Sequence, residues 1–461
     1  MTVITRRGAM LAAGALAACR TPDRAPQDAP WSRADAIVGA IRRTRIPNRT
    51  FSVLDFGATR GSDARPAILA AIAAAHDAGG GRVVIPEGDW RSDGPIHLKS
   101  HVALHLEAGA HLRFTPDPAF YLPVVLTRWE GVEAYTYSPF IYARGQTNIA
   151  LTGGGTIDGQ GEAHWLPWRR EQRADQTRLR DMGRDGVPVA QRVFGAGSRL
   201  RPPFVQFFDC SRVLVEGLTV RDSPFWLIHP VYCSDVIVRN VRAVSRHINS
   251  DGVDPDSCRR VLIEGCDFDV GDDGVAIKAG RDQDGWRVNR PSEDIVVRAC
   301  RYTGATGGGV AVGSEMSGGV RNVFIENIDL ARAHHALYFK ANLDRGGVIS
   351  DIHIRNVRAV ETDTVLIFTN AYHSYRGGQA PPRFERITVA DVTCARARVG
   401  VHILGHEAAP VRDVTVRNLT IDSVDTPLEA RHAENLVLDG MVANGRIVTP
   451  ADAAPPGAYR P

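Results

Sequence analysis

The sequence has almost no lysine. Of its 55 basic residues only Lys99, Lys278 and Lys340 are lysines, and the rest are arginines. Fifty-two acidic residues nearly balance them, so the net charge is +3 and the clustered basic excess of a nucleic-acid-binding protein is absent. A composition of 44% hydrophobic and 23% charged residues excludes a disordered or collagen-like chain. Codon bias explains a shortage of lysine, but the shortage also makes the position of each lysine informative.

Long apolar runs and paired cysteines are missing as well. No segment has the roughly 20 consecutive apolar residues that a membrane span needs. The seven cysteines contain no CxxC pair, so they do not indicate a metal site. The antiparallel hairpin turns that a β-sandwich would need are not evident.

Residues 1–19 predict an export signal. Arg6 and Arg7 precede a short apolar run that ends in Leu16-Ala17-Ala18-Cys19 and resembles a bacterial lipoprotein cleavage box. On that resemblance Cys19 is lipidated, and the protein is exported to the periplasm or anchored in the outer membrane. The alternative is a plain secretory signal with an incidental cysteine. Residues 20–45 predict a linker because they are rich in Pro, Ala, Arg and Asp, and residues 448–461 predict a C-terminal tail.

The sequence between residues 46 and 447 contains a repeat. Each unit begins with two aliphatic residues two positions apart, and apolar residues follow at positions +5 and +7. The first residues of the nine clearest units are Val213, Val236, Val261, Ile295, Val323, Ile352, Ile387, Val414 and Leu436. The period of two predicts strands. Position +4 is Gly, Asn or Asp in every unit except at Ala299, which predicts a bend between two strands.

Stacked units of this kind predict an all-β fold, a right-handed parallel β-helix with coils about 4.8 Å apart. Pro66 to His76, after Asp63 as a cap, predicts a short helix that closes the N-terminal end of the stack. Three cysteines, Cys266, Cys300 and Cys394, fall in core columns. Three more precede position 0 by three residues and should stack: Cys210, Cys233 and Cys258. They are predicted to be apolar core residues, with a disulfide between stacked neighbours as the alternative.

Later in the units a second set of apolar pairs recurs. The pairs are Val253/Pro255, Val275/Ile277, Val310/Val312, Leu337/Phe339, Val365/Ile367 and Val401/Ile403. Asp251 and Asp273 each stand two residues before such a pair, so they share a column on adjacent coils, with Asp272 beside them. Neighbouring carboxylates repel and raise a pKa, which suits general acid/base catalysis. A solvated turn or a calcium site is the alternative.

Two of the three lysines share another column. One position beyond each pair the sequence has Asp256, Lys278, Gly313, Lys340 and Phe368. Lysines on either side of a glycine and next to carboxylates predict a site for an anionic ligand. A pair of surface lysines is the alternative.

Several motifs together resemble the polygalacturonase-type pectin hydrolases of glycoside hydrolase family 28, in particular a bacterial, exo-like branch. They are Asn249-Ser250-Asp251-Gly252, Gly271-Asp272-Asp273-Gly274, the stretch from Gly313 to Asn322, Ser223-Pro224-Phe225-Trp226 with His229-Pro230, and Leu337-Tyr338-Phe339-Lys340. The resemblance covers residues 50–445. It implies hydrolysis of galacturonate-containing pectin with inversion, and no cofactor or metal.

By position in those motifs, Asp272 corresponds to the general acid, and Asp251 and Asp273 to the residues that activate water. Lys340 corresponds to the lysine that binds a galacturonate carboxylate. The resemblance also implies an extracytoplasmic, monomeric enzyme whose partner is pectic oligosaccharide or polysaccharide, with no nucleic acid and no membrane contact beyond the lipid anchor.

The sequence departs from the family at two positions. Gly307 stands where the family has a histidine, and Tyr338 stands where it often has an arginine. The first change leaves a rhamnogalacturonan-type substrate open. His334 and His335 fall in the columns of Asp272 and Asp273, two coils on, and we hypothesise that one of them contacts substrate in place of the absent histidine.

Further candidates for sugar or carboxylate binding are Lys278, Tyr338, His229, Arg281, Trp129, Trp226 and Trp286. The segment Glu162–Pro203 interrupts the coils, and it predicts either a wall at one end of the groove, as in an exo-acting enzyme, or a plain surface excursion. A polysaccharide lyase and a non-catalytic carbohydrate-binding β-helix are the competing functions.

Overall fold

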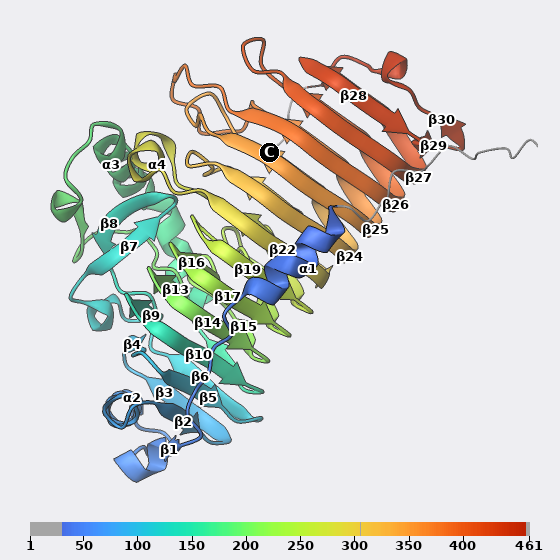
Figure 1. Ribbon diagram of the computed structural model, residues 1–461. Helices are drawn as coiled ribbons and strands as arrows, with labels where there is room; N and C mark the ends of the chain where they lie inside the picture. Colours follow the sequence, from blue (N-terminus) through green and yellow to red (C-terminus); the bar gives the residue numbers. More distant parts are fainter. Residues whose placement is uncertain (1–29, 305, 458–461) are drawn as a thin grey trace, which may run out of the picture.

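The computed structural model describes residues 30–304 and 306–457, which form a stack of coils built from short strands (Figure 1). Strands of successive coils pair in parallel, so three sheets run along the stack around one apolar core. The predicted export signal and Cys19 lie outside the described residues. The fold is the predicted parallel β-helix, and its strands extend from Thr50 to Ile447.

The first sheet holds the position-0 column. Its strands are β1 (Thr50–Ser52), β2 (Gly81–Ile85), β5 (Val102–Leu106), β10 (Thr147–Gly153), β14 (Ser211–Glu216), β17 (Ser234–Arg239), β19 (Arg259–Glu264), β22 (Ser292–Tyr302), β24 (Val320–Lys340), β25 (Val348–Thr369), β26 (Arg383–Leu404), β27 (Val411–Arg431) and β28 (Ala433–Asp439). From β24 to β27 each strand is 21 or 22 residues long and bends through all three sheets.

The second and third sheets hold the other columns. The second comprises β3 (Gly88–Ser92), β6 (Ala110–Phe114), β11 (Thr156–Asp158), β15 (Thr219–Arg221), β18 (Arg242–Ser245), β20 (Asp267–Val270) and β29 (Val442–Ala443), with β30 (Arg446–Ile447) antiparallel to β29. The third comprises β4 (Ile96–His97), β9 (Ile141–Arg144), β13 (Val205–Phe208), β16 (Ile228–Val231), β21 (Val275–Ile277) and β23 (Gly308–Gly313).

The predicted register of the repeat is confirmed. Each position-0 residue from Val213 to Leu436 pairs with the next. Every +4 residue has a positive φ, including Ala299 at 53°, so the bend occurs even without Gly, Asn or Asp. The residue before position 0 also has a positive φ in all nine coils, from Arg212 to Asn435, which marks a second bend that the sequence analysis did not identify.

One predicted register in the third sheet is wrong. Leu337 pairs with Leu366, so Leu366 and Phe368 replace the predicted pair Val365/Ile367, and Thr369 rather than Phe368 follows Lys340 in the lysine column. Residues 365–368 are all apolar, and a period of two cannot set the register of such a run. The rest of that column is as predicted, because Asp256 pairs with Lys278 and Gly313 pairs with Lys340.

Helix α2 (Arg65–Asp77) closes the N-terminal end of the stack, where it buries Ile68 and Ile72 (Figure 1). The predicted cap residue Asp63 accepts a hydrogen bond from the Arg65 N–H at 3.0 Å, although Ala64, directly before the helix, is the N-cap residue.

The predicted linker over residues 20–45 is wrong where the structure describes it. Residues 31–40 form helix α1 (Trp31–Ala40), which lies across the outer face of the first sheet. Trp31, Ala34 and Ile37 recur every three residues on one helix face and pack against a small cluster of apolar residues on that sheet. The predicted tail is partly docked, since Ala454 pairs with Glu429.

A lobe outside the coils is built from the predicted insertion and two neighbouring segments. It contains the antiparallel hairpin β7 (Val125–Trp129) and β8 (Val132–Thr136), β12 (Val193–Phe194), α3 (Arg173–Arg184) and α4 (Asp282–Val288). A separate apolar cluster, in which Trp129 stacks on Phe225, holds the lobe to the coils. Among the described residues, no helix combines the length and the apolar character that a bilayer span requires.

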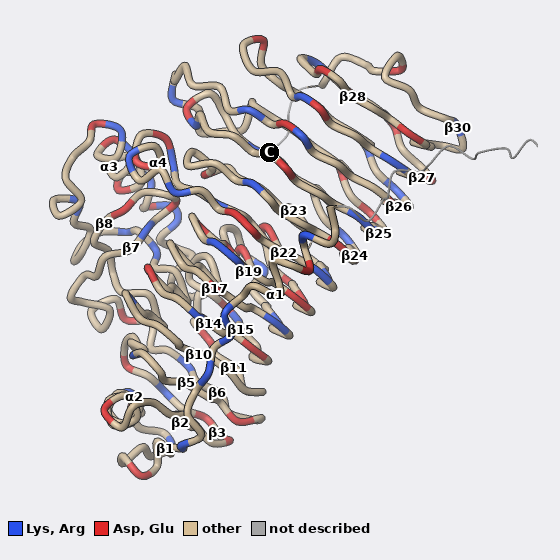
Figure 2. Tube along the Cα trace, in the orientation of Figure 1, with Lys and Arg blue, Asp and Glu red and all other residues tan. Residues whose placement is uncertain are grey.

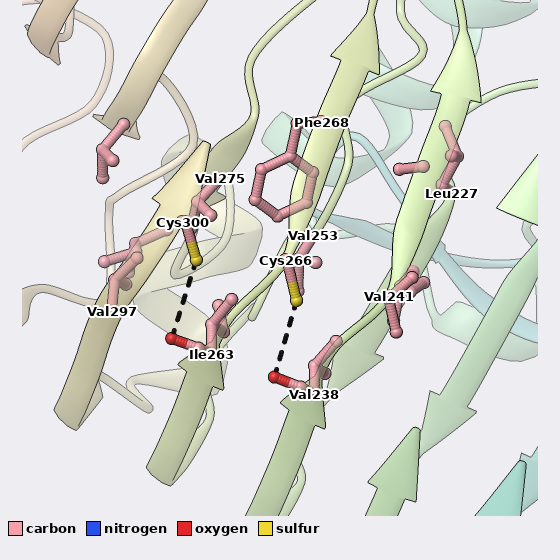
Figure 3. Packing of buried hydrophobic residues seen from close by; sticks show 14 of the residues in the cluster. Leu227, Val238, Val241, Val253, Ile263, Cys266, Phe268, Val275, Val297 and Cys300 are labelled. Atoms are coloured by element: carbon pink, nitrogen blue, oxygen red, sulfur yellow. Dashed lines mark hydrogen bonds between the residues drawn. The ribbon is translucent and has the colours of Figure 1, made fainter. Parts of the chain in front are cut away.

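The six described cysteines are unpaired and buried, as predicted for core residues. The thiols of Cys266 and Cys300 point inward and donate weak hydrogen bonds to Val238 O at 3.8 Å and Ile263 O at 3.9 Å (Figure 3). Burial raises the pKa of the Cys233 thiol well above its usual value, which keeps that thiol unreactive.

Candidate active site

Three aspartates meet at the ends of neighbouring coils. Asp251 precedes the third-sheet bridge residue Val253, and Asp272 and Asp273 occupy the turn between β20 and β21. One carboxylate oxygen of each lies within 4.8 Å of the others. The structure therefore brings together the three residues that the sequence places in adjacent columns.

Burial and mutual repulsion favour the protonated form of this cluster. Burial, and then the neighbouring Asp272, raises the pKa of Asp251 well above its usual value. Burial, and then Asp273, raises the pKa of Asp272. Asp251 and Asp272 interact, so together they hold a proton at a pH where an exposed aspartate is ionised.

Both lysines of the predicted column contact the cluster. Lys340 Nζ donates to Asp273 Oδ2 at 2.6 Å. Lys278 Nζ lies 3.3 Å from Glu315 Oε2 and 3.7 Å from Asp251 Oδ2. Burial lowers the pKa of each lysine, but the surrounding carboxylates outweigh it and raise the net pKa, so both remain charged. Calcium needs six to eight oxygen ligands, and ammonium groups lie against these carboxylates, so the cluster does not fit a calcium site.

The glycine between the lysines is required by close packing. Gly313 has φ +106°, and a Cβ there would lie 2.0 Å from the carbonyl oxygen of Lys340. No larger residue fits, which keeps the space between Lys278 and Lys340 free of side chain.

A cavity of about 600 Å³ opens above the aspartates. Asp251 and Asp272 line its base, and the insertion and the loop from Tyr372 to Arg376 line its walls. The cationic residues that line it are Arg169, Arg173, Arg180, Lys278, Arg281, Lys340 and Arg376. The Arg376 guanidinium contacts the Asp181 carboxylate of α3, so the two walls meet.

Buried ion pairs hold the wall of this cavity. Glu130, on the β7–β8 hairpin, accepts hydrogen bonds from Gln176 at 2.9 Å and Arg180 at 2.6 Å, both on α3. Arg281 bridges the Glu130 and Glu315 carboxylates. Since Glu315 also contacts Lys278, a continuous series of opposite charges connects α3 to the aspartate cluster.

Not every predicted binding residue reaches the cavity. His229 is completely buried, with Nδ1 3.0 Å from Gln206 Nε2 and Nε2 3.6 Å from Asp256 Oδ2, so it supports the site from below. Tyr338 lies under Lys340, whose Nζ is 4.4 Å from the ring centroid. Trp226 does line the cavity, with Lys278 Nζ 4.5 Å from the centroid of its ring.

The other two candidate tryptophans lie elsewhere. Trp129 is buried against Phe225, and its indole N–H donates to Arg201 O at 2.9 Å. Trp286 is partly exposed on α4 and donates to Arg345 O. Neither lines the cavity, so the prediction that they stack on sugar is not supported.

The hypothesis that His334 or His335 replaces the family histidine is also not supported. His335 follows Gly308 in the column of Asp273, as predicted, but it is buried between His334 and Tyr338, at ring distances of 4.2 Å and 4.3 Å. His334 lines a different groove beside Asp363. Neither reaches the main cavity.

Gly307 itself cannot hold a histidine in this backbone. Its φ is +77°, and a Cβ would lie 2.3 Å from the carbonyl carbon of Asp272. The departure from the family pattern is therefore required by the local backbone, because the main chain at Gly307 packs closely against the main chain of Asp272.

Sequence reasoning missed residues that reach the site from distant segments. Glu130, Arg180 and Arg201 have no place in the repeat, and only their three-dimensional contacts identify them. Glu315 could have been predicted from the sequence, because it belongs to the stretch from Gly313 to Asn322 that carries the resemblance.

Comparisons with known proteins agree with this geometry. The family model for glycosyl hydrolases family 28 matches residues 190–436. The chain is 27% identical to a probable polygalacturonase of Vitis vinifera, over 74% of this chain and 67% of that protein. A hyperthermoactive exopolygalacturonase from Thermotoga maritima superposes with a TM-score of 0.85 and 39% identity, over 89% of this chain and 96% of that one. The chain belongs to glycosyl hydrolases family 28 and is a glycoside hydrolase with a parallel β-helix fold.

Proposed function

We propose that this enzyme hydrolyses glycosidic bonds in galacturonate-containing pectic polysaccharide and acts from one end of the chain. The observation that carries the proposal is a group of three aspartates, of which Asp251 and Asp272 line a cavity that is also lined by seven basic residues. A polymer with a carboxylate on each sugar complements such a cavity. The similarity to the Thermotoga maritima exopolygalacturonase supports the same substrate class.

In the proposed reaction Asp272 donates its proton to the oxygen of the leaving sugar. Its raised pKa suits a general acid at neutral pH. Asp251 and Asp273 would hold the attacking water between them. A water molecule that makes two hydrogen bonds of about 2.8 Å spans oxygens up to about 5.6 Å apart, so the separation of at most 4.8 Å accommodates it.

We propose inversion at the anomeric carbon on the basis of this water position. Carboxyl groups of inverting enzymes are commonly about 6.5–9.5 Å apart and those of retaining enzymes about 5–5.5 Å, so spacing alone favours retention here. NMR of the first anomer released decides the question. An α-linked substrate that gives the β product supports inversion, and an α product contradicts it.

The exo mode is proposed from the closed wall. The contact between Arg376 and Asp181 joins the 372–376 loop to α3, and a polymer that ran through the groove would have to displace both. An exo-acting enzyme releases only short products from the first minutes of digestion, whereas an endo-acting one produces intermediate lengths first.

One digestion experiment tests the substrate class. Polygalacturonate and rhamnogalacturonan oligomers are incubated with the enzyme, with and without chelator, while reducing ends and the ultraviolet absorbance of unsaturated products are followed. New reducing ends from polygalacturonate without absorbance support the proposal. Cleavage of rhamnogalacturonan alone would favour that substrate, consistent with the absent histidine. No product from either polysaccharide would contradict a pectic substrate.

We also propose export and lipid anchoring through Cys19, on the sequence pattern of residues 1–19. Metabolic labelling with palmitate and a Cys19→Ala control test this. Loss of label and of membrane association in the variant supports the proposal, and an unlabelled native protein contradicts it.

A further inference from the structure

Arg201, near the end of the insertion, is a buried cation without a carboxylate partner. Its side chain is 0% exposed and donates to Gln172 Oε1 at 3.0 Å, Pro224 O at 3.3 Å and Asn249 Oδ1 at 2.7 Å. The guanidinium also lies over the ring of Phe225 at 5.0 Å. All these acceptors are neutral, and no ion pair of Arg201 is formed within the part of the chain that the structure describes.

The charge persists despite its burial. Burial lowers the pKa of Arg201 to about 10, which still leaves the guanidinium protonated at neutral pH. A buried charge without a direct counter-ion is unfavourable unless nearby opposite charge offsets it. The carboxylates that attract it are Glu130, Asp272 and Asp251.

A short hydrogen-bond series connects Arg201 to the candidate acid. Arg201 Nη2 holds the side-chain oxygen of Asn249, and the Asn249 N–H donates to Asp272 Oδ2 at 3.0 Å. Asn249 has φ +61°, a conformation in which its side chain and its N–H can serve two partners. At Gly307, where the family has a histidine, no side chain fits that could perform such a task.

We propose that Arg201 is a positioning residue for Asp272. Through Asn249 it fixes the orientation of the Asp272 carboxyl, and its charge stabilises the carboxylate that remains once Asp272 has donated its proton. The insertion that closes the cavity would thereby also set the orientation and the pKa of the Asp272 carboxyl. This inference rests on the proposed function, because the role it assigns is exercised in the hydrolysis.

The pH dependence follows from the charges around these groups. Asp273 opposes ionisation of Asp272, as does Asp251 through the repulsion between the two carboxylates, while Lys278, Lys340 and Arg201 favour it. Glu130 and Arg169 act on Arg201 itself with opposite signs. Removal of the Arg201 charge raises the pKa of Asp272, so the alkaline side of the kcat/KM profile moves to higher pH.

The test compares Arg201→Gln and Arg201→Lys with Arg184→Gln, an exposed arginine of α3 that pairs with Asp185. On oligogalacturonate we expect Arg201→Gln to lower kcat about tenfold or more, with little change in KM. The alkaline side of the kcat/KM profile should move to higher pH by about half a pH unit. Arg201→Lys should restore the pH profile but not the full kcat, because ammonium cannot reproduce the guanidinium geometry. Arg184→Gln should match the wild type.

A folded Arg201→Gln with the kcat and pH profile of Arg184→Gln would overturn the inference. If Arg201→Gln does not fold, Asn249→Gly decides, because glycine keeps the positive φ and removes only the side-chain link. A lowered kcat with an unchanged pH profile then supports the inference, and a wild-type kcat overturns it.

The failure of the proposed function is distinguishable from the failure of this inference. A wild type without activity on pectic substrates overturns the proposed function. The titration of Asp272, followed by carboxyl ¹³C NMR, still tests the positioning role of Arg201. A higher midpoint in Arg201→Gln supports it, and a midpoint equal to that of the wild type overturns it.

Discussion

The C-terminal coils and the coils that carry the site share one repeat but treat charge in opposite ways. In β24–β27, charged residues of both signs recur along the strands (Figure 2). Their exposed side chains pair between neighbouring coils, as Arg358 does with Asp329 and Arg386 with Asp351. At the site the charges are buried: Lys340, at the end of β24, and Asp273 are 5% and 0% exposed. The same architecture therefore supports either a solvated ladder or a buried ionic cluster.

This difference has a physical consequence. Exposed pairs contribute little because water and salt screen them, whereas a buried charge that loses its partner is strongly destabilising. The column of Asp273 continues as Gly308, His335 and Thr364, so the carboxylates are confined to the level of the two adjacent coils that hold Asp251 and Asp273. Substitutions at that level should affect both chemistry and stability, and substitutions in the ladder should affect neither.

The largest expected effect is on chemistry. Asp272→Asn should lower kcat by about 10²–10⁴-fold, because an amide cannot donate the proton that the leaving oxygen needs. The melting temperature should not fall, since the variant removes a repelled carboxyl. Asp329→Asn, the same change in the ladder, is the control and should retain wild-type kinetics. Equal activity of the two variants would remove Asp272 from the mechanism.

The second prediction separates the lysines. Lys340→Met leaves Asp273 buried without its ion partner, and we expect about 3–5 kcal/mol of destabilisation together with a lower kcat. KM should rise for acidic oligosaccharides more than for neutral ones, because the carboxylate of the sugar loses its cation. Lys99→Met changes an exposed lysine and should alter neither unfolding nor kinetics. Matching denaturation curves for the two variants would contradict a structural role for the Lys340–Asp273 pair.

The third prediction concerns pH and has opposite signs in the two regions. Burial raises the pKa of Asp254 well above its usual value, so the folded state resists ionisation and loses stability as pH rises from about 4 towards neutral. Asp254→Asn should therefore melt at a higher temperature than the wild type at pH 7, and the difference should shrink towards pH 4.

The ladder provides the matched control for Asp254. The hydrogen bonds from Arg358 lower the pKa of Asp329, so that carboxylate stabilises the fold above the unfolded pKa and the contribution is lost as pH falls. Asp329→Asn should melt at or slightly below the wild-type temperature at pH 7 and converge with it in acid. Melting curves from pH 4 to 8 that show the same sign for both variants would contradict the comparison.

Local patterns in the sequence were sufficient for the stack itself. Alternating aliphatic residues fixed nine coils in register, and Gly, Asn or Asp at position +4 located the bends. The pattern failed in the run 365–368, where all residues are apolar and no alternation with polar residues sets the register. It also failed at α1, where an apolar stripe of only three or four side chains is hidden in a Pro- and Arg-rich segment.

For a related reason, only part of the candidate site could be predicted from the sequence. Asp251, Asp272, Asp273 and the two lysines belong to the repeat, so their columns predict their proximity. Glu130 and Arg201 come from loops that obey no period, and the contact of Arg281 with Glu130 joins residues 151 positions apart. His334 and His335 shared a column with the aspartates, but the column does not say whether a side chain points into the cavity or into packing.

The smallest expected effect tests the ladder directly. Arg358 is 75% exposed and its partner Asp329 is 48% exposed, so solvent screens the pair almost completely. Arg358→Gln should leave the melting temperature within about 1 °C of the wild type, and raising the salt concentration should remove even that difference. Arg386→Gln, one coil further on, should behave in the same way. If either variant unfolds as early as Lys340→Met, the ladder is a structural element comparable to the buried cluster, and the contrast between the two regions fails.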